Sequence, residues 1–595
     1  MSAVSSTPNF NHGYPTPGPQ SPTPQKVMDH VFFLSQGAWK QAREDQQFDF
    51  VVIGTGFCSL AFAERTLSHN PLARILILER GTFFLPQHFQ NLPLPYRQTL
   101  GGLSETFPWT LSAQTAKQPA GNISWQHGMV PFYGGRSIMW SAWCPRPEPQ
   151  EMRAWPAETI AAAQRNFASA EALLNVIPAD RIDAGESRAA LEVIGRTRPV
   201  YGTLQKGLQE ILGADFHRID SGTRWIPAPL AAAAGADSGI DFAKFSTPAV
   251  LLELADRQAA LAANGDGSPL SIVTECTVER IHSQGGVATA LETSRGVVAL
   301  GDAQLVLAMG TLPPTTLVLN SFPETPGAGS TFSAHFITSV VARVPRDDFP
   351  FGEGLGSLEV AAIYLAGESP AGMQYHVQLS VLSDREPVIN AQKAERYAPD
   401  VVATASAAQL RGSEDYLVFV CAVLGELDEA NPENWLKPDG GPDPTCNVTL
   451  QVLANGTDRE TWDTMDEATF QMMERVFSPA GAGRVEYWHG SPDDGSWSSG
   501  RPAIPERRVP GLVHEGSTLA IGETGEFPVD TGYRLRGTEN VFVTGGGLWP
   551  TGGSWNPTMT MTALAQDLAD RLARPSGETA EDHAEVAATE AAGAR

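Results

Sequence analysis

The chain has 595 residues, of which 42% are hydrophobic and 18% charged, and its formal net charge is −26. This length is too great for one simple core and favours two interleaved domains. The acidic balance argues against a nucleic-acid partner, because phosphate binding needs clustered Lys and Arg. The sequence contains no run of about 20 apolar residues, so no transmembrane helix is expected. The N-terminus lacks a basic segment followed by an apolar run, so we expect a cytoplasmic protein without membrane association.

The two ends of the chain differ in composition from the rest. Residues 1–26 are rich in Pro, Ser and Thr, and they predict a partly disordered arm over 1–45. Within it, the apolar stretch 31–39 could pack against the body of the protein or against a partner subunit. Residues 575–595 form a Glu/Ala-rich tail that we expect to be disordered.

The first strong pattern is a strand, a glycine turn, a helix and a second strand. The strands are expected over 48–53 and up to Glu79, with the helix over 60–67. In the turn, Gly54 allows the tight bend, Gly56 lets the backbone approach a pyrophosphate, and Ser59 is small enough for close helix–strand packing. Glu79 is placed to accept a hydrogen bond from a ribose hydroxyl. This order of elements predicts a dinucleotide-binding unit.

A second glycine-rich motif is PFYGGRSIMWSAWCPRP, residues 131–147. Its paired Gly134 and Gly135, followed by Ser137, indicate a backbone that lies flat against a planar ligand. The alternative is a structured loop that places Trp140 and Trp143 in the core.

The middle of the chain predicts helices followed by strands. Residues 155–240 begin as helix, 271–293 alternate like antiparallel strands with a turn at Gly285–Gly286, and 301–311 form a buried strand that ends in a turn at Gly310. Several alternating runs in 335–453 predict a large, mostly antiparallel sheet, followed by a helix near 461–476. The fold class is therefore α/β plus α+β, a Rossmann-like dinucleotide-binding domain with an inserted substrate domain. The boundaries we assign are 46–155, 240–330 and 505–574 for the first domain, 156–239 and 331–504 for the second.

The closing segment carries two candidate catalytic residues. Gly545–Gly547 end a strand, and Asn556 precedes the helix that begins near Pro557, so helix N-terminal amides could face an electron-rich ligand. Asn556 could equally be only the N-cap of that helix. His514, in the segment PGLVHEGSTLAIG, is a candidate base, although a lone His is more often structural.

Several other candidate sites are weaker or absent. The competing histidines are His127, His335 and His489. No two histidines have metal-ligand spacing and the five cysteines include no C-x-x-C pair, so we expect reduced thiols and no metal site.

Together these motifs resemble the glucose–methanol–choline (GMC) family of FAD-dependent oxidoreductases, and most closely its pyranose oxidase and glycoside 3-oxidase branch. The likeness rests on GTGFCS with Glu79, VLAMGTLPPTTLVLNS (306–321), PGLVHEGSTLAIG and VFVTGGGLWPTGGSWNPTMTMTALA. By this resemblance His514 is the catalytic base and Asn556 its partner at the substrate oxygen. The FAD-binding positions that the resemblance and the motifs imply are Gly54, Gly56, Ser59, Glu79, Gly134, Gly135, Ser137, Met139, Trp140, Ser141, Val278, Gly310, Gly546, Pro557 and Thr558. Among them Val278 would meet the adenine through its backbone, and Ser141 would lie near flavin N5.

One residue departs from the family pattern. In covalent pyranose oxidases the loop that corresponds to Ser137–Trp140 contains a His bonded to the flavin, and Met139 stands at that position here. A thioether does not readily form that bond, so the resemblance implies non-covalent FAD.

The resemblance implies oxidation of a secondary alcohol, with hydride transfer to flavin N5 and O₂ or a quinone as final acceptor. A neutral His514 would take the hydroxyl proton and Asn556 would hold the oxygen. A sugar or glycoside hydroxyl at C2 or C3 is the first expectation, a non-sugar alcohol of secondary metabolism the second, and an inactive flavin fold the third. The resemblance also makes a homo-oligomer possible.

Overall fold

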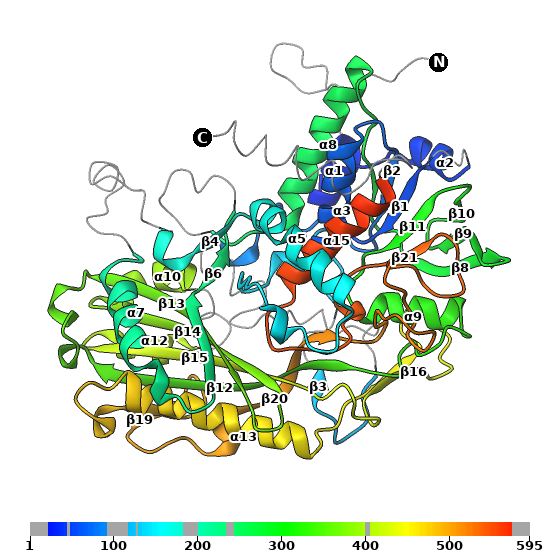
Figure 1. The fold of residues 1–595 in the computed structure, drawn as a ribbon. Coiled ribbons are helices and arrows are strands. Elements are labelled where there is room, and N and C mark those ends of the chain that lie inside the picture. Colours follow the sequence, from blue (N-terminus) through cyan, green and yellow to red (C-terminus); the bar gives the residue numbers. More distant parts are fainter. Residues whose placement is uncertain are drawn as a thin grey trace, which may run out of the picture.

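The computed structural model describes residues 22–44, 48–91, 117–125, 129–182, 200–233, 243–398 and 405–573. The segment 575–595, residues 1–21 and 45 of the predicted N-terminal arm, and the candidate His127 lie outside the described residues. Two large sheets organise the rest, a parallel one among the helices and an antiparallel one beside it (Figure 1).

The parallel sheet has five short strands in the order β21-β11-β1-β2-β7. Their bounds are β21 Val541–Val543, β11 Gln304–Leu307, β1 Phe50–Ile53, β2 Ile75–Leu78 and β7 Ser271–Val273. The strands β1 and β2 read FVVI and ILIL and are buried at every position. Such continuous apolar runs are typical of parallel strands covered on both faces.

Helices cover this sheet. The first strand leads into α3 (Phe57–His69), which packs against the last helix, α15 (Thr558–Ala573), and α15 also packs against α5 (Ala157–Leu174). Asp570 of α15 accepts from Arg65 at 2.6 Å and contacts His69 at 2.7 Å, both on α3. The first and last parts of the chain are therefore joined at the dinucleotide-type sheet.

Residues 22–44 fold against the same half of the molecule. They form α1 (Pro24–Val31) and α2 (Gln36–Glu44). Leu34 donates its N–H to the Ile272 carbonyl of β7 at 3.0 Å, and the Trp39 indole, which is buried, donates to the Arg295 carbonyl at 3.2 Å. The apolar stretch 31–39 thus packs against the body, one of its two expected positions.

The predicted hairpin forms, with one difference at its start. The strands β8 (Val278–Gln284) and β9 (Val287–Thr293) pair across Gly285 and Gly286, both at positive φ, and β10 (Val298–Ala299) extends the sheet. Residues 271–273, expected to be antiparallel, instead form β7 and pair in parallel with β2. The short run Ser-Ile-Val is mostly buried, and periodicity does not distinguish the two pairings in so short a run.

The second sheet has nine strands and is antiparallel except where β20 meets β3. Its main path is β19-β18-β12-β15-β14-β13-β5, and β20 pairs with β12 and β3. The bounds are β3 Ser124–Trp125, β5 Gly222–Pro227, β12 Ser333–Pro345, β13 Leu358–Glu368, β14 Gln374–Asp384, β15 Tyr416–Glu426, β18 Glu486–Gly490, β19 Gly495–Ser498 and β20 Arg508–Gly516.

Both faces of this sheet are covered. The outer face packs against α13 (Gly456–Gln471) and α7 (Thr203–Asp215) in one apolar cluster. The other face turns toward the parallel sheet and carries buried polar side chains of β12, β14 and β15, among them His335, His376 and Glu426. The remaining elements are α8 Thr247–Asn264, α9 Leu312–Ser321, α10 Pro387–Tyr397, α12 Ala407–Leu410, α14 Ile504–Arg507, β4 Val176–Pro178, β6 Pro229–Ala231, β16 Trp435–Pro438 and β17 Val448–Gln451.

The architecture confirms the predicted fold class. The domain boundaries stay predictions. One observation bears on them: β20 falls in the range 505–574 assigned to the dinucleotide-binding domain but pairs with β12 of the antiparallel sheet.

Candidate active site

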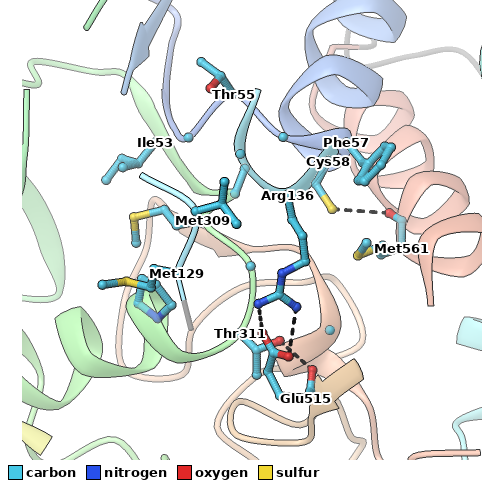
Figure 2. A pocket seen from close by; sticks show the side chains of 18 of the residues that line it. Ile53, Thr55, Phe57, Cys58, Met129, Arg136, Met309, Thr311, Glu515 and Met561 are labelled. Carbon is cyan, nitrogen blue, oxygen red and sulfur yellow. Dashed lines mark hydrogen bonds and ion pairs between the residues drawn. The ribbon is translucent and has the colours of Figure 1, made fainter. Parts of the chain in front are cut away.

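A long cavity opens at the carboxyl ends of the parallel strands, between them and β20. Residues that follow β1, β2 and β11 line one side, and residues of β20 and the start of α15 line another. Ligands of open parallel sheets characteristically bind at this edge. Figure 2 shows part of the lining, with Thr55 and Phe57 above and Glu515 below.

The first turn shapes one end of the cavity through its backbone. Gly54 has a φ of +107°, and a Cβ there would lie 2.5 Å from the Ala308 carbonyl oxygen. At Gly56 a Cβ would meet no atom within 4 Å and would project into open space beside the N-terminus of α3. Only glycine fits the first position without strain, and glycine keeps the second open to a ligand.

Glu79 lines the cavity at the end of β2 and is already hydrogen-bonded. Its carboxylate accepts from the Thr55 hydroxyl at 2.5 Å and from the Gly81 N–H at 2.7 Å. Burial raises the pKa of Glu79, although these two hydrogen bonds oppose the shift. The Thr55 oxygen also accepts from the Gly134 N–H at 2.8 Å, which ties the second glycine motif to the first.

The second glycine motif contributes only some of its residues to the lining. Trp140 and Ser141 line the cavity, and the Trp140 indole donates to the Phe245 carbonyl at 2.7 Å. Ser137 instead donates to the Gly134 carbonyl at 2.7 Å and supports the turn from behind. Met139 is buried against Phe89 and Ile138, away from the cavity.

An ion pair crosses the lower part of the cavity (Figure 2). Arg136 donates twice to Glu515, at 3.0 and 2.8 Å, from the short 3-10 helix Gly135–Ile138 to β20. The Thr311 hydroxyl donates to the Glu515 carbonyl at 2.8 Å. Three segments that are distant in sequence therefore meet beside His514.

His514 and Asn556 line this same cavity. The Nδ1 atom of His514 lies 2.9 Å from Nδ1 of His335, and Nε2 of His335 lies 2.9 Å from the Gly553 carbonyl oxygen. Asn556 is buried, and its Oδ1 accepts no hydrogen bond within the part of the chain that the structure describes. Burial lowers the pKa of His335 to about 4.

Most of the predicted site residues therefore meet in one place. Those that line the cavity are Gly54, Gly56, Glu79, Gly135, Trp140, Ser141, Val278, Gly310, Gly546, Pro557, Thr558, His514 and Asn556. Ser59, Gly134, Ser137 and Met139 lie behind it and do not line it.

Several lining residues were not predicted from the sequence. They include Thr55, Arg80, Arg136, Thr311, Pro444, Thr445 and Glu515. Thr55 and Arg136 lie inside quoted motifs and could have been noticed there. Pro444 and Thr445 come from the link between β16 and β17, where no motif indicates a ligand.

Comparisons with known proteins agree with this geometry. Residues 435–565 match the family model described as GMC oxidoreductase. The match covers 131 of the 595 residues, so this part of the chain is similar to the C-terminal region of GMC oxidoreductases. The similarity agrees with the resemblance to FAD-dependent alcohol oxidoreductases that the sequence motifs indicate.

A solved structure is similar to this chain in fold. Pyridoxine 4-oxidase from Mesorbium loti is similar with a TM-score of 0.50 and 15% sequence identity, over 88% of this chain and 99% of that one. No curated protein sequence matches the chain. The pyranose oxidase branch therefore stays a prediction.

Two other expectations from the sequence concern membrane spans and metal sites. Within the described ranges, no helix has the length and apolar character needed to cross a bilayer. Over the same residues, no three His, Cys, Asp or Glu side chains gather in a way that could bind a metal ion.

Proposed function

We propose that this enzyme oxidises a secondary alcohol beside non-covalently bound FAD, with His514 as the base that takes the hydroxyl proton. The observation that carries the proposal is the single cavity shared by the dinucleotide-type turn, His514 and Asn556. Each of these has an ordinary structural explanation when considered alone. Because they line one cavity, a proton acceptor, an amide and a turn suited to a dinucleotide lie together.

The described residues fit FAD. Gly56 and Gly310 both leave open space where a Cβ would project, so the backbone can approach a pyrophosphate closely. Glu79 stands at the end of β2, where a ribose is bound in such folds. Val278 and the neighbouring Cys276 and Thr277 line the cavity near Glu79, which suits an adenine. FAD, when bound, supplies the hydride acceptor.

The protein would contribute proton removal and orientation. An alcohol is a poor hydride donor while its oxygen keeps the proton, so a base at that oxygen lowers the barrier. His514 would accept the proton, and the Asn556 amide would donate to the oxygen and hold it beside the imidazole. Orientation of this kind is a large part of enzymatic rate enhancement.

The residue at position 139 supports the proposal that FAD is bound without a covalent link. Met139 offers no nucleophilic nitrogen, and its side chain packs against Phe89 and Ile138. We expect acid precipitation of the pure protein to release yellow flavin into the supernatant. A yellow pellet under a colourless supernatant would contradict non-covalent binding.

The substrate we propose first is a sugar or glycoside oxidised at a ring C2 or C3 hydroxyl. Trp140 and Trp143 both line the cavity and could stack on a sugar face. The indole N–H of Trp143 is buried and donates no hydrogen bond within the described residues, so it could serve a hydroxyl. The second candidate is a non-sugar alcohol, and the similar solved structure is named for pyridoxine, which is not a sugar.

The test is anaerobic flavin bleaching with two panels, one of pyranoses and glycosides and one of aryl and aliphatic alcohols. Bleaching by the first panel alone supports the sugar proposal, and bleaching by the second alone supports the other candidate. O₂ and a benzoquinone, added afterwards, show which acceptor reoxidises the flavin.

The same assay tests the base. We expect His514→Ala to retain FAD and to lose about 10²–10⁴-fold in the rate of bleaching, the range typical of a lost general base. Asn556→Ala should lose less, because water can replace an amide donor in part. A matched control is His489→Ala, since His489 contacts a glycine carbonyl, that of Gly500, and does not line the cavity. Normal bleaching by His514→Ala would remove His514 from the mechanism.

A further inference from the structure

His514 lies at an irregularity in the pairing of β12 with β20. Ser333 pairs with Gly516 and His335 with Val513, so two steps along β12 correspond to three along β20. One extra residue of this kind forms a β-bulge, which bends the strand and redirects a side chain. His514 has a φ of +58°, which residues with a side chain rarely adopt. The bulge therefore gives this imidazole a direction that a regular strand would not.

The redirected imidazole meets His335. The two Nδ1 atoms are 2.9 Å apart, and the rings are nearly perpendicular, at 86°. On the far side of its ring, Nε2 of His335 lies 2.9 Å from the Gly553 carbonyl oxygen. A carbonyl oxygen only accepts hydrogen bonds, so Nε2 of His335 must carry a proton.

This contact fixes the proton between the two rings. Burial holds the pKa of His335 near 4, so the ring is neutral at neutral pH and carries a single proton. The Nδ1 atom of His335 is then an acceptor, and the proton between the rings belongs to Nδ1 of His514. In neutral His514 the nitrogen that can accept a proton is therefore Nε2. His376, whose ring also contacts His335, has its pKa lowered by burial and adds no positive charge.

His335 also holds the loop that carries Asn556. Gly553 donates its N–H to Oε1 of Glu426 at 2.8 Å while its carbonyl accepts from His335. Its φ is +59°, and a Cβ there would lie 2.1 Å from the Trp555 ring. Both polar groups of this peptide are bound to the antiparallel sheet three residues before Asn556.

We propose that His335 is a positioning residue that selects the tautomer of His514 in which Nε2 is the proton acceptor, and that it anchors the Asn556 loop through Gly553. The catalytic meaning rests on the proposed function, because it requires His514 to be the base. When Nε2 accepts the proton, the substrate O–H bond breaks and an N–H bond forms. The resulting imidazolium still donates from Nδ1 to His335, so this contact serves both protonation states.

The tautomer can be observed without a substrate. The FAD-loaded protein is labelled with ¹³C,¹⁵N-histidine, and magic-angle-spinning spectra separate protonated from unprotonated ring nitrogens. The His514 signals are identified by their loss in His514→Gln. We expect a protonated Nδ1 and an unprotonated Nε2 in the wild type. A proton on Nε2 would overturn the proposal with no variant needed.

Two variants and one control complete the test. His335→Leu removes the acceptor and should give His514 a mixture of tautomers, together with at least a tenfold slower bleaching by an alcohol that bleaches the wild type. His335→Gln keeps an acceptor for His514 and a donor for Gly553. It should therefore restore most of the single tautomer of His514 and most of the bleaching rate. His489→Gln should change neither, since His489 also contacts a glycine carbonyl but lies elsewhere.

Flavin absorbance and near-UV circular dichroism establish that each variant is folded and loaded. Unchanged His514 signals in a folded His335→Leu would contradict the proposal, and if that variant does not fold, the wild-type spectrum still decides. Normal bleaching by His514→Ala with the expected tautomer would refute the proposed function alone. The wrong tautomer with inactive His514→Ala would refute only the role of His335.

Discussion

The two sheets build their sides of the cavity by different means. The parallel sheet contributes mainly turns in which glycines bring the backbone to the cavity, as at Gly54 and Gly56. The antiparallel sheet contributes side chains of β20, such as His514 and Glu515, and supports them from behind with buried polar residues, as where His335 contacts His514. The side built by the parallel sheet is therefore disturbed by any added side-chain atom. The side built by the antiparallel sheet depends on which polar side chains are present and how they are protonated.

This difference separates the two tasks of the proposed function, cofactor binding and proton transfer. A cofactor shared by many enzymes can be held by backbone groups and a helix N-terminus, which need no particular side chain. Proton transfer needs one nitrogen at one position, so its support must come from side chains with a defined donor and acceptor. Substitutions on the two sides should therefore fail in different ways.

The largest expected effects are on the parallel side and distinguish two glycines of one turn. Gly56→Val adds a side chain into open space, so the fold should survive while FAD affinity falls by about 10²-fold or more, or roughly 2.7 kcal/mol. Gly54→Ala places a Cβ 2.5 Å from the Ala308 carbonyl at a positive φ, and it should lower the free energy of unfolding by about 3 kcal/mol. FAD titration of the apoproteins and urea unfolding measure the two effects. Full FAD content in Gly56→Val would contradict the claim that FAD lies against the backbone of this turn.

The next effect belongs to the antiparallel side and depends on pH. Burial lowers the pKa of His335 from 6.5 to about 4 and lowers that of His376 well below its ordinary value. Below pH 6.5 these two histidines take up protons in the unfolded chain but not in the folded protein. Their contribution to the free energy of unfolding is therefore fully present above pH 6.5 and is lost as the pH falls toward 4. For His335 this loss is about 3 kcal/mol.

The measurement is the free energy of unfolding of wild type and His335→Gln between pH 7 and 4. The variant should lose less stability on acidification, and His489→Gln should follow the wild type. Taking the difference isolates His335 from buried carboxylates such as Glu426, whose raised pKa acts in the opposite direction. Parallel curves for His335→Gln and wild type would show that His335 is not kept neutral by burial.

The same contrast explains what the sequence could predict. The turn at Gly54 and Gly56, the following helix and Glu79 are local in sequence, so a short motif can reveal them. The positive φ of Gly54 also requires glycine at that position. The contact of His514 with His335 joins residues 179 apart and depends on strand register and a bulge. In the sequence His335 was one of several histidines with no distinguishing neighbour.

Met139 shows the limit of motif spacing within a loop. Its position in the motif predicts contact with the cofactor, but the short 3-10 helix Gly135–Ile138 places it in an apolar cluster instead. The neighbouring Trp140 and Ser141 line the cavity. Spacing therefore identified the loop and did not fix which side chains face inward.

The smallest expected effect concerns the link between the two sides, the pair Arg136–Glu515. The Glu515 side chain is 7% exposed and that of Arg136 36%, so solvent weakens the attraction from the arginine end. Arg136→Gln leaves a buried carboxylate without its bidentate partner, and we expect it to lower the free energy of unfolding by about 1–2 kcal/mol. Glu515→Gln should lose about as much or less, because an amide can still accept from Arg136.

A double-mutant cycle by urea unfolding of the FAD-loaded protein measures the coupling of the pair. We expect about 1 kcal/mol, since the two charges act as one bidentate contact. Strictly additive losses would mean that the pair does not join the sides and that Thr311, which donates to the Glu515 carbonyl, fixes β20 through the backbone. In that case the two sides would be linked through a backbone carbonyl group, and not through a pair of charged side chains.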